Sequence, residues 1–250
     1  NIWRNHYEKT IEQVKDLEAK GISVVLGTSC SLLHVPYTLE GENKLSAEVK
    51  RHFSFAVEKL SELLDLKKVL SGKAESSVLE ENKALFASVR PNSEDKSVKE
   101  RCAAITDADY TRLPAFSERE KIQKEEFKLP LFPTTTIGSF PQSADVRQNR
   151  NAFKKGEKTK EEYVAFNREK IAEWVKIQED LDLDVLVHGE FERNDMVEYF
   201  GELLSGFLFT EKAWVQSYGT RCVKPPIIWG DVRRLSAMTV EWSTYAQSLT

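Results

Sequence analysis

The feature that most constrains the fold is an alternation of amphipathic helices with short β-branched runs, which occurs in two separate stretches of the chain. In the first stretch, residues 7–20 have apolar positions at helical spacing, and Gly21 supplies a stop signal. Residues 22–26 then form a β-branched run that predicts a buried strand, and residues 45–70 predict one long helix. Helix, buried strand and helix in succession are typical of an α/β protein with a parallel sheet.

The second stretch repeats this pattern further along the chain. Residues 134–137 and 184–187 predict short buried strands on either side of a helix at residues 159–181. Asn194 or Asp195 is a suitable cap for a short helix that runs through Gly201. Further short β-like pieces and a closing helix complete the prediction, around Phe207, Trp214, residues 218–223, residues 227–229 and residues 239–250.

Between the two stretches the composition becomes polar and charged, which predicts a mostly helical, half-solvated connector. Strands followed by helices, with polar residues just past the strand ends, favour (β/α)8 TIM barrels that carry their sites at the C-terminal face. One such barrel takes roughly 250 residues, and each stretch holds only a few strand–helix units. We therefore predict parts of two barrels, the end of one and the start of another.

Composition excludes several classes of protein. The net charge of −4 and the lack of a Lys/Arg cluster with interleaved aromatics argue against a nucleic-acid partner. No apolar run approaches the roughly 18 residues of a membrane span. The three cysteines, Cys30, Cys102 and Cys222, are odd in number and widely spaced, which fits a reducing cytoplasm. Neither they nor the four histidines have the spacing of a local metal site.

Ile137, Gly138 and Ser139 directly follow the predicted strand at residues 134–137. Glycine lets the backbone approach a ligand, and exposed N–H groups with a Ser hydroxyl form a natural carboxylate cradle. The alternative is an ordinary turn at a strand end.

His188, Gly189 and Glu190 follow the predicted strand at residues 184–187. A carboxylate at this position can hold an ammonium group or act as a general base. The alternative is a solvated loop carboxylate beside a packed, hydrogen-bonded histidine.

Arg221 and Cys222 lie in a third polar segment, residues 218–226. The planar guanidinium of Arg221 is suited to an anionic or flat aromatic ligand. Cys222 has no candidate base beside it in sequence, and the alternative is a small buried hydrophobic residue.

These segments resemble the family of cobalamin-independent methionine synthases. The resemblance rests on LPLFPTTTIGSFPQSADVR, DLDVLVHGEFERNDMVEYFGE and VQSYGTRCVKPPIIWGDV, in the same order as in the family, and on VVLGTSCSLLHVPYTL further upstream. It implies an internal fragment with three parts: residues 1–72 end the N-terminal barrel, 73–128 form the helical connector, and 129–250 begin the catalytic barrel.

The resemblance implies transfer of a methyl group from 5-methyltetrahydropteroyltri-L-glutamate to homocysteine, with zinc holding the homocysteine sulfur as a thiolate. It implies that Ile137, Gly138, Ser139 and Glu190 bind homocysteine or methionine, whereas Arg221 and Cys222 line the folate site. The family's zinc ligands and proton donor have no counterpart here, so we expect no catalytic or metal-binding residue in this chain and no activity from it alone. Two alternatives remain open: a single-barrel zinc methyltransferase with a corrinoid donor, and a non-catalytic binding module.

Overall fold

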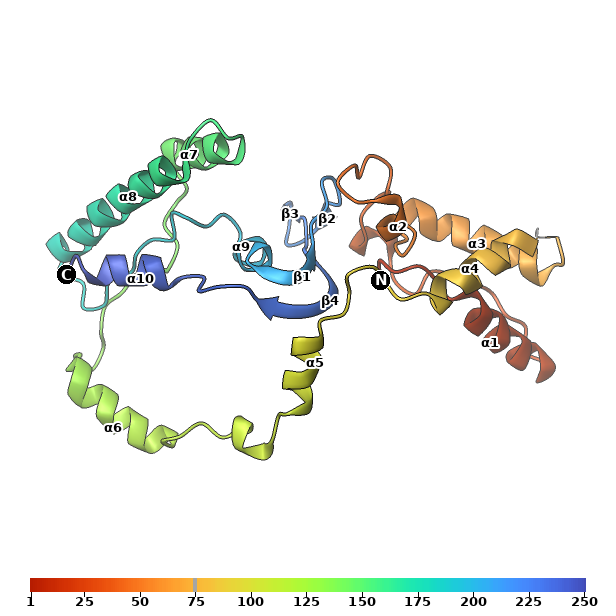
Figure 1. Cartoon of the computed structure of the whole chain (residues 1–250), viewed down its shortest axis with the longest axis horizontal. Coiled ribbons are helices and arrows are strands. Elements are labelled where there is room, and N and C mark those ends of the chain that lie inside the picture. The colour runs from red at the N-terminus through yellow and green to blue at the C-terminus, as the bar shows by residue number, and fades with distance from the viewer. Residues whose placement is uncertain (74–75) are drawn as a thin grey trace. The chain divides into compact units, whose positions relative to one another are not determined.

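A computed structural model describes residues 1–73 and 76–250, and it combines helices with a few short strands (Figure 1). The chain forms two compact units, the first made of residues 1–96 and 206–233, the second of residues 97–205 and 234–250. The α/β character agrees with the prediction, whereas the two-barrel architecture and its three-part boundaries stay predictions. Within the described residues, no helix is long and apolar enough to cross a membrane.

The first half of the chain contains five of the helices and a short 3-10 turn, which are α1 (Tyr7–Ala19), η1 (Leu32–His34), α2 (Ala47–Lys50), α3 (Ala56–Leu70), α4 (Ser76–Ala87) and α5 (Lys96–Ala103). The second half adds η2 (Asp107–Tyr110), α6 (Phe116–Phe127), α7 (Ala144–Lys154), α8 (Lys160–Asp180), α9 (Met196–Glu202) and α10 (Val240–Gln247). The strands are β1 (Leu204–Leu208), β2 (Val215–Gln216), β3 (Cys222–Val223) and β4 (Ile227–Arg234). Strand β1 pairs with β4, and β2 pairs with β3 in an antiparallel hairpin.

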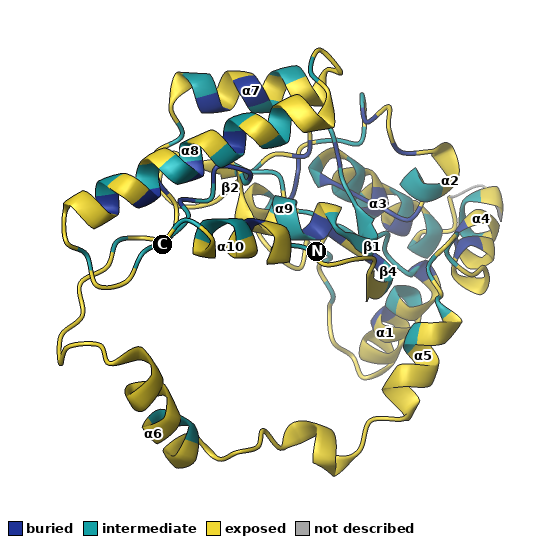
Figure 2. Ribbon diagram, turned by 60° about the vertical axis from the view of Figure 1, so that its left-hand side comes forward, coloured by how far each residue is buried: buried dark blue, intermediate teal, exposed yellow. Residues whose placement is uncertain are grey.

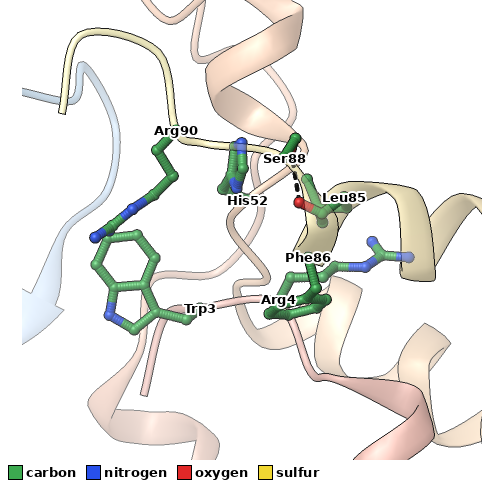
Figure 3. A pocket seen from close by; sticks show the side chains of 7 residues that line it. All are labelled: Trp3, Arg4, His52, Leu85, Phe86, Ser88 and Arg90. Atoms are coloured by element: carbon green, nitrogen blue, oxygen red, sulfur yellow. Dashed lines mark hydrogen bonds between the residues drawn. The ribbon is translucent and has the colours of Figure 1, made fainter. Parts of the chain in front are cut away.

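The core of the first unit is aromatic. Phe53 and Phe55 are fully buried and pack with Trp229 of β4, and the ring of Trp3 lies 5.0 Å from that of Phe53. The guanidinium of Arg90 lies 5.0 Å from the Trp3 ring (Figure 3) and 5.4 Å from the Trp229 ring, at distances typical of cation–π contacts. Trp229 belongs to the 206–233 segment, so this core joins residues that are far apart in sequence.

Two carboxylates attach the 206–233 segment to the rest of the first unit at a second point. The buried carboxylate of Glu42 accepts hydrogen bonds from the backbone N–H groups of Glu211 at 2.6 Å and Lys212 at 2.7 Å. In return, Glu211 accepts from the N–H groups of Asn43 at 2.8 Å and Lys44 at 3.1 Å. Charge-assisted bonds of this kind are about twice as strong as neutral ones.

The single helix predicted over residues 45–70 is wrong, because α2 ends at Lys50 and α3 begins at Ala56. Phe53 instead forms a bridge with Trp3, and the N–H of Ser54 donates to the carbonyl of Ile2. The Ser54 N–H and the His52 carbonyl are thus bonded to the N-terminal segment, whereas the N–H groups of residues 51–53 still donate within the turn that ends α2. Tertiary contacts therefore outweigh the helical periodicity that the sequence shows here.

The strand predicted at residues 22–26 is also absent from the structure, although these residues are all described. Val25 is 94 % exposed. A strand in a parallel sheet takes its backbone hydrogen bonds from its neighbours. No strand lies beside this segment among the described residues, so a β-branched run alone does not form one.

In the second unit, the helix predicted over residues 159–181 is confirmed as α8, which packs beside α7 (Figure 1). Thr159 caps it: its hydroxyl accepts from the N–H of Glu162, whose carboxylate accepts from the N–H of Thr159. Fully buried Ile171 of α8 packs with Phe140, Phe191 and Trp242.

The two segments predicted as strands in this unit form no regular strand in the structure, but they lie side by side. Isolated parallel bridges join Thr135 to Val185 and Ser139 to Gly189. The buried side chain of Gln178 binds the backbone of the second segment, since it accepts from the Val187 N–H at 2.9 Å and donates to the Val187 carbonyl at 2.8 Å. Hydrogen bonds thus join the second segment to α8. We call the C-terminal ends of the two segments, at Ser139 and Gly189, the strand ends.

Helix α6 is nearly all exposed, as is α5 (Figure 2). Its charged residues form local pairs, such as Lys124 with Glu120 at 2.7 Å, which add only a few tenths of a kcal/mol each. The connector that composition predicts over residues 73–128 stays a prediction.

Candidate functional site

The second of the two bridged segments ends in two residues with left-handed backbones. Gly189 has φ = 88° and Glu190 has φ = 59°. The N–H of Phe140 donates to the Gly189 carbonyl at 3.1 Å, which joins this turn to the end of the first segment. A Cβ at Gly189 would lie only 2.5 Å from the Phe140 ring and 2.7 Å from the Phe191 ring, so only glycine fits.

The left-handed backbone of Glu190 brings its carboxylate to Gly138. A Cβ built on Gly138 would lie 3.0 Å from Oε1 of Glu190, closer than most real contacts. A non-glycine residue in this region costs on the order of 1–3 kcal/mol, and such strain is concentrated at functional sites. The structure thus brings together two of the predicted site residues, from strand ends about 50 residues apart in sequence.

A charged network surrounds this carboxylate. Arg193 places Nη2 at 3.4 Å from Oε1 of Glu190, and its Nε lies 3.0 Å from Oε1 of Glu192. The same Glu192 oxygen lies 3.1 Å from Nε2 of His188. The Glu190 side chain is 19 % exposed and paired, so the alternative of a solvated loop carboxylate is wrong. His188 is packed and hydrogen-bonded, as the same alternative predicts.

Glu192 is buried yet ionised. Burial by itself raises the pKa of this carboxyl, but the hydrogen bond from His188 and the nearby charges of His188 and Arg193 outweigh it, and the net pKa is lowered. Burial raises the pKa of the neighbouring Tyr163 and Tyr199 phenols, which therefore stay neutral donors. The Tyr163 hydroxyl donates to the Glu192 carbonyl at 3.1 Å.

Helix α7 contributes a further cation. Nη2 of Arg150 lies 3.0 Å from the Phe191 carbonyl and 2.7 Å from the Arg193 carbonyl, and it also contacts the side-chain oxygen of Gln142. We call residues 189–193 the 189–193 loop. Hydrogen bonds from Arg150 of α7 and Tyr163 of α8 hold this loop, and Arg193 forms ion pairs within it.

A cavity of about 280 Å³ in the first unit is lined by Trp3, Arg4, His52, Leu85, Phe86, Ser88 and Arg90 (Figure 3), and none of these residues was predicted to bind a ligand. A larger cavity of about 820 Å³ lies in the second unit, at the strand ends. Gly138, His188, Glu190 and Arg193 all line the larger cavity. It offers a carboxylate, a guanidinium and backbone groups to a small zwitterionic ligand.

The other predicted residues have different places. Ile137 and Ser139 are exposed at the end of the first strand, and Ile137 is 75 % exposed. Arg221 and Cys222 belong to the first unit, at the β2–β3 hairpin, where the Arg221 carbonyl accepts from the N–H of Ser217 at 2.9 Å. Cys222 is an exposed free thiol, so the alternative of a buried hydrophobic residue is wrong.

Sequence reasoning missed Arg150, Glu192 and Arg193. The charged residues that directly follow Glu190 were a usable signal, because charges beside a strand-end carboxylate tend to pair with it. Arg150 carried no such signal, since its partners lie about 40 residues further along the chain.

No three His, Cys, Asp or Glu side chains within residues 1–73 and 76–250 are grouped closely enough to hold a metal ion. That the zinc ligands lie outside this chain, as the family resemblance implies, stays a prediction.

Residues 132–250 match the family model described as the catalytic domain of cobalamin-independent synthase. The whole chain is 59% identical to a 5-methyltetrahydropteroyltriglutamate–homocysteine methyltransferase of Streptococcus pneumoniae, strain D39, and 57% identical to that of Campylobacter jejuni, strain RM1221. The chain spans about a third of the length of these curated relatives, 33% in each case.

Proposed function

Because the chain belongs to the cobalamin-independent synthase family, we propose that it supplies part of the homocysteine and folate sites of a methyltransferase. The reaction is transfer of a methyl group from 5-methyltetrahydropteroyltriglutamate to homocysteine, which forms methionine. The names of the relatives support this assignment. We also propose a cytoplasmic location, because free cysteines are typical of proteins in a reducing compartment.

The observation that carries the homocysteine site is the approach of Glu190 to Gly138. In our proposal the Glu190 carboxylate binds the ammonium group of the amino acid, while Ser139 and the backbone of residues 137–139 bind its carboxylate. The two contacts come from two neighbouring segments that parallel bridges join, and these bridges set their separation. Holding both ends of the substrate backbone aims its sulfur in one direction, and such orientation lowers the entropic part of the barrier.

The folate site is assigned to Arg221 and Cys222. Both lie at the β2–β3 hairpin, where the Arg221 N–H donates to the Tyr218 carbonyl at 3.0 Å. A planar guanidinium can stack on a flat ring or bind an acidic group. The exposed thiol of Cys222 is proposed as a wall of the site, with no covalent role.

Zinc, when bound in such an enzyme, keeps the homocysteine sulfur as a nucleophilic thiolate. Its ligands and the catalytic residues are assigned to positions outside this chain. The role of residues 137–139 and Glu190 is then to bind and orient the amino acid.

The test is Glu190→Gln in a full-length enzyme that contains this sequence. The amide keeps the shape and loses the charge, so we expect the KM for homocysteine to rise roughly 10- to 100-fold, as for loss of one hydrogen bond to a charged group. Methionine formation is measured with zinc and without cobalamin. Glu157→Gln, a change at an exposed carboxylate on the same unit, is the matched control.

The outcomes separate the candidate functions. An unchanged KM in Glu190→Gln would remove this carboxylate from the site. Turnover only with a methylated corrinoid donor would favour the single-barrel type of enzyme. Binding of homocysteine without any turnover in a folded, zinc-loaded enzyme would favour a binding module.

A further inference from the structure

We propose that Arg150 and Glu192 are positioning residues that hold the 189–193 loop so that Glu190 faces Gly138. This inference rests on the proposed role of Glu190 in the homocysteine site. It adds two residues that do not themselves contact the amino acid.

The loop needs an external restraint because of its backbone. Glu190 has a left-handed φ of 59°, which a side chain with a Cβ adopts only when the surroundings enforce it. If the loop relaxed to an ordinary backbone, the carboxylate would leave its place beside Gly138. The position of this carboxylate therefore depends on the contacts that hold the residues after it.

Arg150 provides the first restraint. Its Nη2 lies within hydrogen-bond distance of the Phe191 and Arg193 carbonyls, at 3.0 Å and 2.7 Å. These two carbonyls flank Glu192, so one guanidinium spans the second half of the loop. The group comes from α7, whose contacts with α8 fix it in the second unit.

Glu192 provides the second restraint. Its side chain is 2 % exposed, and Oε1 binds both Nε2 of His188 and Nε of Arg193. Arg193 then reaches Glu190 with Nη2 at 3.4 Å. A buried carboxylate thus fixes the guanidinium that pairs with the site carboxylate. Bonds between charged groups in a buried place are strong enough to hold this arrangement.

The test uses Arg150→Met in the full-length enzyme, with Arg147→Met on an exposed position of α7 as the matched control. We expect the KM for homocysteine to rise about tenfold in Arg150→Met, which corresponds to loss of one charge-assisted hydrogen bond. The KM for the methyl-folate should stay within about twofold, because Arg221 and Cys222 lie in the other unit. Arg150→Lys, which keeps the charge, should recover part of the homocysteine affinity.

Glu192→Gln is the second variant, and it covers the case in which Arg150→Met does not fold. It keeps an acceptor for His188 and Arg193 but removes the charge, so the homocysteine KM should again rise while the folate KM holds. Calorimetric binding of methionine gives the same comparison without turnover. An equal loss for both substrates, tracking a lower melting temperature, would show a merely structural role and overturn the proposal.

The two proposals fail in different ways. If Glu190→Gln weakens homocysteine binding while Arg150→Met and Glu192→Gln leave it unchanged, positioning is refuted and the proposed function stands. If the unaltered full-length enzyme forms no methionine, the proposed function fails first.

Discussion

At the scale of single residues, two backbone angles decide where the candidate site carboxylate lies. Gly189 and Glu190 both have positive φ, and together they turn the chain so that Glu190 approaches Gly138. Two features require glycine at position 189. Its φ of 88° is left-handed, and the Phe140 and Phe191 rings leave no room for a Cβ atom. The position of the Glu190 carboxylate thus depends on the glycine that precedes it.

Gly189→Ala is expected to destabilise the second unit by about 2–4 kcal/mol. Roughly 1 kcal/mol comes from the left-handed backbone and the remainder from overpacking against Phe140. Gly156→Ala is the control, because Gly156 has a similar φ of 75° with nothing within 4 Å of an added Cβ. Chemical denaturation of both variants measures the difference, and equal losses would contradict the steric part of the argument.

At the scale of elements, helices with local end signals form where they are expected. Helix α8 begins with the reciprocal bonds of Thr159 and Glu162, and α9 is capped by Asp195, whose side chain accepts from the Glu198 N–H at 2.9 Å. Two other segments differ from their prediction. The helical pattern over residues 45–70 is interrupted, and the β-branched run at residues 22–26 forms no strand.

Thr159→Ala should lower the free energy of unfolding by about 1 kcal/mol, since it leaves the N–H of Glu162 without its capping acceptor. Thr159→Ser retains the hydroxyl and should stay within about 0.5 kcal/mol of the unaltered chain. Urea denaturation followed by far-UV circular dichroism distinguishes the two. A similar loss in both variants would mean that the methyl group, not the cap, stabilises the start of α8.

At the scale of the whole molecule, the order of residues along the chain differs from their grouping in space. Residues 206–233 pack with residues 1–96, through Trp229 in the aromatic core and Glu211 beside Glu42. The proposed homocysteine residues lie in one unit and the proposed folate residues in the other.

The 250-residue chain by itself is expected to form no methionine from homocysteine and methyl-folate, with or without added zinc. The reason is that its described residues group no set of three metal ligands, and that it spans only 33% of its methyltransferase relatives. The measurement is a methionine assay on the purified chain beside the full-length enzyme. Turnover by the chain alone would refute the assignment of the catalytic residues to positions outside it.

The sequence by itself determined the features whose causes lie within a few residues. These are α1, α8 and α9 with their stop and cap residues, and the polar residues at 137–139 and 188–190. Only the tertiary structure decided the break between α2 and α3, because it depends on Phe53 pairing with Trp3 about 50 residues away. It also decided that residues 134–139 and 184–189 meet through isolated parallel bridges and not as regular strands. The orientation of Glu190 was likewise decided there, through a left-handed backbone that follows Gly189 and its contacts with the Phe140 and Phe191 rings. Local signals act through neighbouring backbone groups, whereas these contacts form only when distant segments have packed together.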